Sequence, residues 1–155
     1  MTWAEALAAW PGAVWLQRSY VAYLVVNALH VLGLGLLVGA ILPLDLRLLG
    51  AFRAPLAVLA PVLTRAAAAG LGLALGTGLW LFSVKPGAYL ANPAFLWKLG
   101  LLTLALANVA AQHAGAGWRA ALAGGGVTPR VRAHAALSAL LWPGVLLAGR
   151  WIGFL

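Results

Sequence analysis

The chain has 155 residues, of which 65% are hydrophobic and only 8% are charged. Soluble globular domains carry about 25% charged residues, so this composition excludes an ordinary soluble fold and favours a protein whose solvent is lipid. The net charge of +8 does not indicate nucleic-acid binding, because the basic residues stand singly at the ends of apolar segments. The absence of cysteine excludes disulfides and thiolate sites.

The first residues predict a short helix at the membrane surface. Residues 2–17, TWAEALAAWPGAVWLQ, lack the basic region that opens a signal peptide. Thr2 followed by Glu5 is a capping-box pattern, which begins a helix, and Pro11-Gly12 should break that helix. The segment also holds three tryptophans, Trp3, Trp10 and Trp15. Because tryptophan favours the headgroup zone of a bilayer, we expect an interfacial helix before the first span.

Four stretches without charged residues follow, and each is close to the length of about 17–25 residues that a spanning helix needs. They predict spans over about residues 19–44, 62–84, 95–118 and 131–151. The expected connections between the spans are residues 43–55, 85–93 and 123–130. The predicted fold class is an all-α membrane protein: a four-transmembrane-helix bundle with a short N-terminal interfacial helix, in which residues 1–155 form a single integral membrane domain.

The basic residues predict the orientation of the bundle. Loops that carry more Lys and Arg tend to stay in the cytoplasm. The side of the first and third connections has the larger group, which is Arg47, Arg53, Arg65, Arg119, Arg130 and Arg132. The opposite side has Arg18, Lys85, Lys98 and Arg150. Both termini should therefore lie outside the cytoplasm.

Two GxxxG patterns lie in the first two spans, GLLVG (Gly35, Gly39) and GLALG (Gly72, Gly76). Small residues at this spacing let helix backbones approach closely in lipid. We expect them to serve packing within the bundle. Contact between copies in a homo-oligomer and space for a flat cofactor beside the helix are the alternatives, which the motif alone does not separate.

A histidine in the first span carries most of the functional information. His30 stands in NALHVLGLGLLVGAIL (residues 27–42), where an ionisable side chain is costly and marks a candidate functional site. The structural alternative is a hydrogen bond within the core, and Asn27 lies one turn earlier on nearly the same face. Two further histidines, His113 and His134, lie on other spans.

Measured from the charged residue at the outer end of each span, the three histidines lie at similar depths. The reference residues are Arg18, Lys98 and Arg150. At 1.5 Å per residue the depths are about 18, 22 and 24 Å. The three imidazoles are therefore predicted to share one layer of the bundle.

Imidazoles that face one another inside a four-helix bundle fit haem b best. Its iron takes two axial imidazoles, its ring is apolar, and bundle cores are recurrent sites for it. A closed zinc site wants a fourth ligand, and copper transport favours sulfur ligands that this chain lacks. We expect His30 and His113 to be the iron ligands, with His134 as the replacement for His113. The full candidate set for cofactor binding is His30, His113, His134, Asn27, Gly33, Arg47 and Arg132, with the arginines near the propionates.

Three segments carry a resemblance to a known family: ALHVLGLGLLVGAILPLDLRLLG (28–50), NPAFLWKLGLL (92–102) and SALLWPGVLLAGRWIGF (138–154). Together they resemble small bacterial four-span membrane proteins of unknown function, a family loosely similar to the membrane domain of copper resistance protein D. The resemblance covers nearly the whole chain and implies a multi-pass protein of the bacterial cytoplasmic (inner) membrane, so both termini would be periplasmic. In the family pattern one histidine matches His30 and another matches His113.

These observations predict a haem b-binding membrane protein, a minimal cytochrome b that transfers electrons between a quinone in the bilayer and a partner protein at the outer face. Such a protein is an electron carrier or redox subunit rather than a stand-alone enzyme. The alternatives are a metal-ion transporter or channel of the copper type and a non-catalytic scaffold subunit. An absorption spectrum separates them, because only a haem protein has a Soret band.

Overall fold

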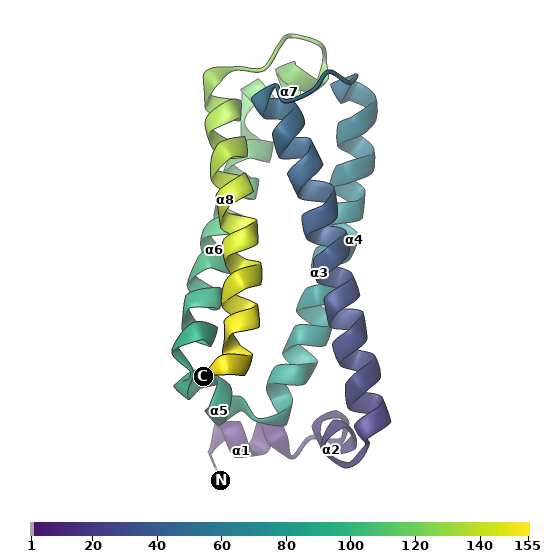
Figure 1. Ribbon diagram of the computed structural model, residues 1–155, viewed down its shortest axis with the longest axis vertical. Coiled ribbons are helices and arrows are strands. Elements are labelled where there is room, and N and C mark those ends of the chain that lie inside the picture. The colour runs from purple at the N-terminus through teal and green to yellow at the C-terminus, as the bar shows by residue number, and fades with distance from the viewer. Residues whose placement is uncertain (1) are drawn as a thin grey trace.

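The computed structural model describes residues 2–155, and most of them are helical (Figure 1). The elements in chain order are α1 (Trp3–Ala8), α2 (Pro11–Arg18), α3 (Tyr20–Leu49), α4 (Leu56–Val84), α5 (Pro86–Ala91), α6 (Pro93–Ala114), α7 (Ala116–Leu122), α8 (Pro129–Trp151) and η1 (Ile152–Phe154). The helices α3, α4, α6 and α8, the last extended by η1, are long and apolar enough to cross a membrane. The predicted all-α bundle with four spanning helices is confirmed.

The N-terminal segment forms two short helices that lie across one end of the bundle (Figure 1). The backbone N–H of Thr2 donates to the Glu5 carboxylate at 2.7 Å, and the Thr2 hydroxyl accepts from the backbone N–H of Glu5 at 3.3 Å. The predicted capping box is therefore confirmed. The predicted break at Pro11 separates α1 from α2, because a proline that opens a helix has no N–H to bond to the preceding turn.

Tryptophans attach this segment to α4. The indole N–H of Trp10 donates to the Ser83 hydroxyl, and that of Trp80 donates to the backbone oxygen of Gly12, both at 3.0 Å. These bonds satisfy polar groups near the ends of the spans, where a ring with one polar edge is favoured.

The first two spans are longer than predicted, because two prolines lie inside helices rather than at their ends. Helix α3 continues through Pro43 to Leu49 and ends at Gly50, which has φ 91°. Helix α4 contains Pro61. A spanning helix tolerates proline because neighbouring helices and local adjustment satisfy the freed backbone groups. The first connection is therefore residues 50–55 instead of 43–55.

The third span is shorter than predicted. Helix α6 ends at Ala114, and Gly115 has extended backbone with ψ 141°. The chain then turns into the short helix α7, whose Trp118 packs with Leu44 and Leu48 in a core cluster near the connecting loops. The indole is 5% exposed. Trp118, which was predicted to end the third span, thus packs into the core at the loop end of the bundle instead.

The spanning helices form two antiparallel pairs, α3 with α4 and α6 with α8. The two pairs are joined mainly by α3 and α8, and within residues 2–155 the backbones of α4 and α6 do not approach one another. Figure 1 shows α3 diverging from α8 toward the end of the bundle at which both termini lie, while α3 and α4 cross.

The α3–α4 pair is held close by glycines that face each other. A Cβ atom on Gly33 would lie 2.7 Å from the backbone nitrogen of Ala74, and one on Gly70 would lie 2.5 Å from the backbone nitrogen of Leu37. Such distances are too short for any side chain, so the two backbones cross here in direct contact. Gly33, which we expected to contribute to a cofactor site, is a packing residue at this crossing.

The four GxxxG glycines do not make this contact. A Cβ atom on any of them would meet no atom within 4 Å, and all four are exposed: Gly35, Gly39, Gly72 and Gly76. The expectation that they pack within the bundle is therefore wrong, because the crossing uses the neighbouring face of each helix.

The position of the termini leads to a topology prediction. Both termini lie at the same end of the bundle (Figure 1), and the Arg-rich loops lie at the other end. A reporter enzyme that is active only outside the cytoplasm, fused after Leu155, is expected to be active. Activity of a cytoplasm-only reporter at the same position would contradict this orientation.

Candidate functional site

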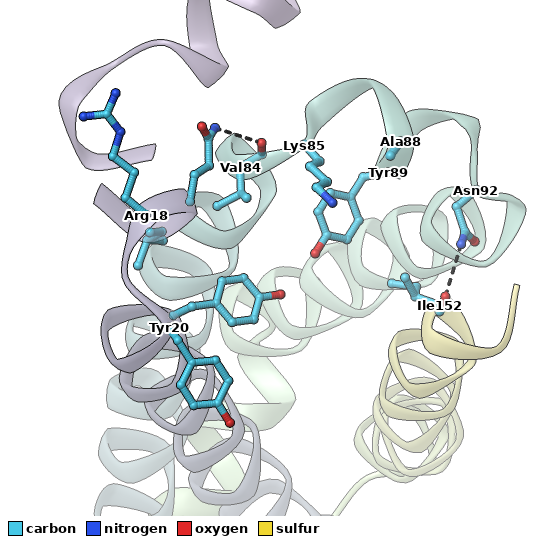
Figure 2. Close-up of a pocket in the computed structure, with 11 residues that line it drawn as sticks. Arg18, Tyr20, Val84, Lys85, Ala88, Tyr89, Asn92 and Ile152 are labelled. Atoms are coloured by element: carbon cyan, nitrogen blue, oxygen red, sulfur yellow. Dashed lines mark hydrogen bonds between the residues drawn. The ribbon is translucent and has the colours of Figure 1, made fainter. Parts of the chain in front are cut away.

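Three connected cavities run between the two helix pairs. The inner cavity, of about 230 Å³, lies among α3, α4, α6 and α8. It shares His30, Lys98 and several apolar residues with a groove of about 660 Å³, which continues toward the termini. The groove shares Tyr23 and Tyr89 with a mouth of about 620 Å³, shown in Figure 2. A ligand path therefore extends from the surface to the inside of the bundle.

His30 is held in one orientation by α4. Its Nδ1 lies 2.9 Å from the backbone oxygen of Ala74 and 3.1 Å from the hydroxyl oxygen of Thr77. A carbonyl only accepts hydrogen bonds, and the Thr77 hydroxyl donates its own proton to the Leu73 backbone oxygen. Nδ1 therefore carries a proton, and in the neutral form of the imidazole Nε2 is an acceptor.

Gly78 makes the space that the imidazole occupies. A Cβ atom there would lie 3.0 Å from Cε1 of His30, tighter than ordinary van der Waals contact. Gly78 also lines the inner cavity. Thr77 and Gly78 of α4 hold His30 in this position. Neither was predicted from the sequence, since neither belongs to a recognisable motif.

Lys98 enters the same site from α6. It lines both the inner cavity and the groove. Its side chain runs along α8 at Gly149, which has no side chain of its own. A Cβ atom on Gly149 would lie 3.5 Å from Cδ, Cε and Nζ of the lysine. No Asp or Glu lines any of the three cavities. The amine thus has no carboxylate partner among the residues that line this site.

The remaining walls of the inner cavity are apolar and aromatic. Phe82 and Phe95 stack with ring centroids 5.4 Å apart and planes at 4°. The indole of Trp142 is 1% exposed, and its N–H has no hydrogen-bond partner among the described residues. Flat rings beside two polar groups suit a flat ligand with few polar atoms.

The other two histidines lie toward the loop end. His113 is exposed near the end of α6, where its Nδ1–H donates to the Val109 backbone oxygen at 2.9 Å and its ring lies 5.0 Å from that of Trp118. His134 bonds through Nδ1 to the Asn108 side-chain oxygen at 2.7 Å, and Asn108 in turn donates to the backbone oxygen of His134 at 3.0 Å. Neither histidine lines the three cavities.

The structure does not bring the histidines together. Lys98 and Val145 line the inner cavity with His30. Leu102 and Trp142 are the lining residues nearest to the other histidines, and from them α6 still rises about 16 Å to His113 and α8 about 12 Å to His134. Two imidazoles on one iron each need a metal–nitrogen distance of about 2 Å. No second imidazole therefore lies within reach of His30 to be the other axial ligand of one iron. Among residues 2–155, no three His, Cys, Asp or Glu side chains group to hold a metal ion.

The other expected site residues are spread along the chain. Asn27 lines the groove but makes no hydrogen bond to His30 in the described structure, whose partners are on α4. Arg47 donates from Nε to the Ala54 backbone oxygen at 2.7 Å and so fixes the first connection. Arg132 is exposed near the start of α8. The two arginines lie outside the inner cavity and the groove.

Comparison with known proteins gives no further assignment: no family model, no curated protein and no solved structure matches this chain.

Proposed function

We propose that this membrane protein binds a lipid-soluble compound of the quinone class in the inner cavity, as a component of membrane electron transfer. The observation that carries the proposal is that His30, whose Nδ1 is bonded to α4, and Lys98 line one cavity whose other walls are apolar or aromatic. Ligand sites typically combine such walls with a few polar groups.

The two polar groups complement the oxygens of this ligand class. A quinone carries two carbonyl acceptors on a flat apolar ring, and Lys98 donates to one of them. When the ring is reduced, its hydroxyls become donors, and neutral His30 accepts at Nε2 because its proton lies on Nδ1. The stacked rings of Phe82 and Phe95 provide a flat surface beside the ligand.

Tryptophan fluorescence tests the proposal. The purified protein in lipid nanodiscs is titrated with decyl-ubiquinone and with menadione, and we expect saturable quenching because Trp142 lines the cavity. Trp142→Phe should remove most of the saturable component while the other tryptophans remain. Quenching that rises linearly with quinone, and equally in both proteins, would contradict a specific site.

Haem b held by His30 is the second candidate. Metal-ligating histidines usually donate their other ring N–H to a carbonyl or carboxylate, and His30 does so to Ala74. The absorption spectrum of the purified protein separates the candidates. A Soret band that disappears in His30→Ala would assign the haem, and a colourless protein that releases a quinone into organic solvent would assign the first candidate.

The cellular setting belongs to the same proposal. The four apolar helices make a lipid bilayer the environment of the chain. We place the protein in a bacterial inner membrane with both termini periplasmic, where a redox partner protein would reach the mouth of the groove. The resemblance to small four-span bacterial membrane proteins supports this setting.

A further inference from the structure

One face of α3 carries polar side chains where lipid-facing residues would be apolar. Tyr23, Asn27 and His30 are spaced by four and three residues, so they lie above one another on a single helix face. All three line the groove. The stripe runs from the mouth, which includes Tyr23, to the inner cavity, which includes His30.

Asn27 is the informative member of the stripe. It lies inside a spanning helix, is exposed, and its side chain has no hydrogen-bond partner among the described residues. An amide that contacts hydrocarbon and has no hydrogen-bond partner raises the free energy of the folded protein by several kcal/mol. This is on the order of the cost of two lost hydrogen bonds. Water in the groove removes this cost, and the groove of about 660 Å³ has the room for it.

The mouth is built to admit water. It is lined by polar side chains from several elements, which are Gln17, Arg18, Tyr20, Tyr23, Lys85, Tyr89 and Asn92. Figure 2 shows Lys85 extending into this space beside Tyr89, with Arg18 on the opposite rim. Burial raises the pKa of Tyr89 to about 12, so its hydroxyl remains a neutral hydrogen-bonding group.

Side-chain to backbone bonds keep the rim in place. Gln17 donates to the backbone oxygens of Ala8 and Val84 at 3.0 and 3.2 Å. Asn92 donates to the backbone oxygen of Ile152 at 3.3 Å. Figure 2 draws the bond to Val84 and the bond from Asn92 to Ile152. The opening is therefore a fixed feature of the fold rather than a gap between unconnected helix ends.

We propose that the groove is a water-filled passage that connects the surface at the terminal end of the bundle with His30. Water in the passage reaches Nε2, so protons enter and leave the imidazole from that side of the membrane only. The titratable groups that face the passage are Tyr23 and His30 on α3, Tyr89 on α5, Lys98 on α6 and Arg150 on α8. The passage exists whether or not a quinone binds, so its test is independent of the proposed function.

Cysteine labelling tests the passage, and the chain is suited to it because it contains no cysteine. Tyr23→Cys and Asn27→Cys place a thiol on the stripe, while Val25→Cys and Leu29→Cys place one on exposed faces of the same helix that line none of the cavities. Each variant, in nanodiscs, is treated with a charged, water-soluble methanethiosulfonate. The thiolate attacks the sulfur of the reagent, forms a mixed disulfide and releases methanesulfinate, and the thiolate forms in water and not in hydrocarbon.

The passage predicts that both stripe positions react roughly tenfold or more faster than both control positions. Size-exclusion profiles confirm that each variant is folded. Labelling of a denatured sample of the same variant confirms that it carries a reactive thiol. Labelling of Asn27→Cys as slow as that of Leu29→Cys would overturn the proposal. The reagent is also added to one side of sealed vesicles in which all copies have the same orientation. If the stripe cysteines react only when the reagent is on the side of the connecting loops, the passage does not open at the terminal end.

Discussion

Replacing Gly70 with alanine is expected to destabilise the bundle by about 1–3 kcal/mol, the cost of forcing an extra group into a packed interior. The new Cβ would lie 2.5 Å from the backbone nitrogen of Leu37 and 2.8 Å from the backbone oxygen of Gly33. Neither atom belongs to a flexible side chain, so α3 and α4 must move apart. Unfolding of the purified protein in mixed micelles by increasing SDS measures the loss.

Gly72→Ala is the matched control, because it lies on the same helix and belongs to a GxxxG pattern. Its Cβ would meet nothing within 4 Å. We expect no loss of stability, since surface substitutions usually change it by no more than about 0.5 kcal/mol. Alanine favours a helix more than glycine does, so helix propensity would stabilise both variants, and equal destabilisation by Gly70→Ala and Gly72→Ala would show that the crossing does not determine the effect.

Removing either polar group of the inner cavity should weaken quinone binding at least roughly tenfold, which corresponds to about 1.4 kcal/mol. Lys98→Met keeps an unbranched apolar stem but loses the donor, and His30→Leu loses the imidazole. The loss follows because a carbonyl or hydroxyl of the ligand is then buried without its partner. The dissociation constant from the fluorescence titration measures it, and this prediction rests on the proposed function.

The other two histidines provide the controls. His113→Ala and His134→Ala change residues that line none of the three cavities. Binding should stay within about twofold of the unmodified protein, well under the tenfold step. His134→Ala removes the bond to Asn108 and can lower stability, so its unfolding is measured in parallel. Loss of binding in His113→Ala with an intact fold would restore the layer of histidines inferred from the sequence.

The spanning helices were predictable because hydrocarbon imposes a simple rule on composition and length. The charge-free run in residues 19–44 gave the first span, and α3 contains it almost entirely. The boundaries were less predictable, since Pro43 looks like a helix end in an aqueous setting. Inside a bundle the same proline is tolerated, and only Gly50 with its positive φ ends the helix.

Of the residues in the candidate site, His30 was predicted from the sequence and Lys98 was missed. Lys98 was missed because depth in the membrane was measured from it. His30 stood out because it is ionisable within an apolar run. Lys98 was taken as marking the membrane boundary, although it lines the same cavity as His30. Depths counted from it placed His113 beside His30, whereas α6 carries His113 about 22 Å further along. A lysine near a helix end gives no sign in the sequence of whether it faces a headgroup or a cavity.

The glycines illustrate a second limit. Gly33 and Gly35 are two residues apart, and so are Gly70 and Gly72, yet only one of each pair meets the opposite helix. Two positions on a helix differ by about half a turn, so the rotation of each helix about its axis decides which is buried. That rotation depends on the whole set of helix contacts, which a local motif does not contain.

The contact between α3 and α8 would give the molecule a way to change the size of the ligand that we propose it binds. The helix pairs touch in one core cluster near the loop end, which includes Leu48 and Ala135, and in a second cluster further along, which includes Leu37 and Trp142. A larger or smaller side chain there alters the angle between the pairs, and the helices are long enough to turn a small angle into a wider or narrower cavity at the other end. We infer that new specificities arise by substitution in this distant core, while the residues that meet the ligand stay the same.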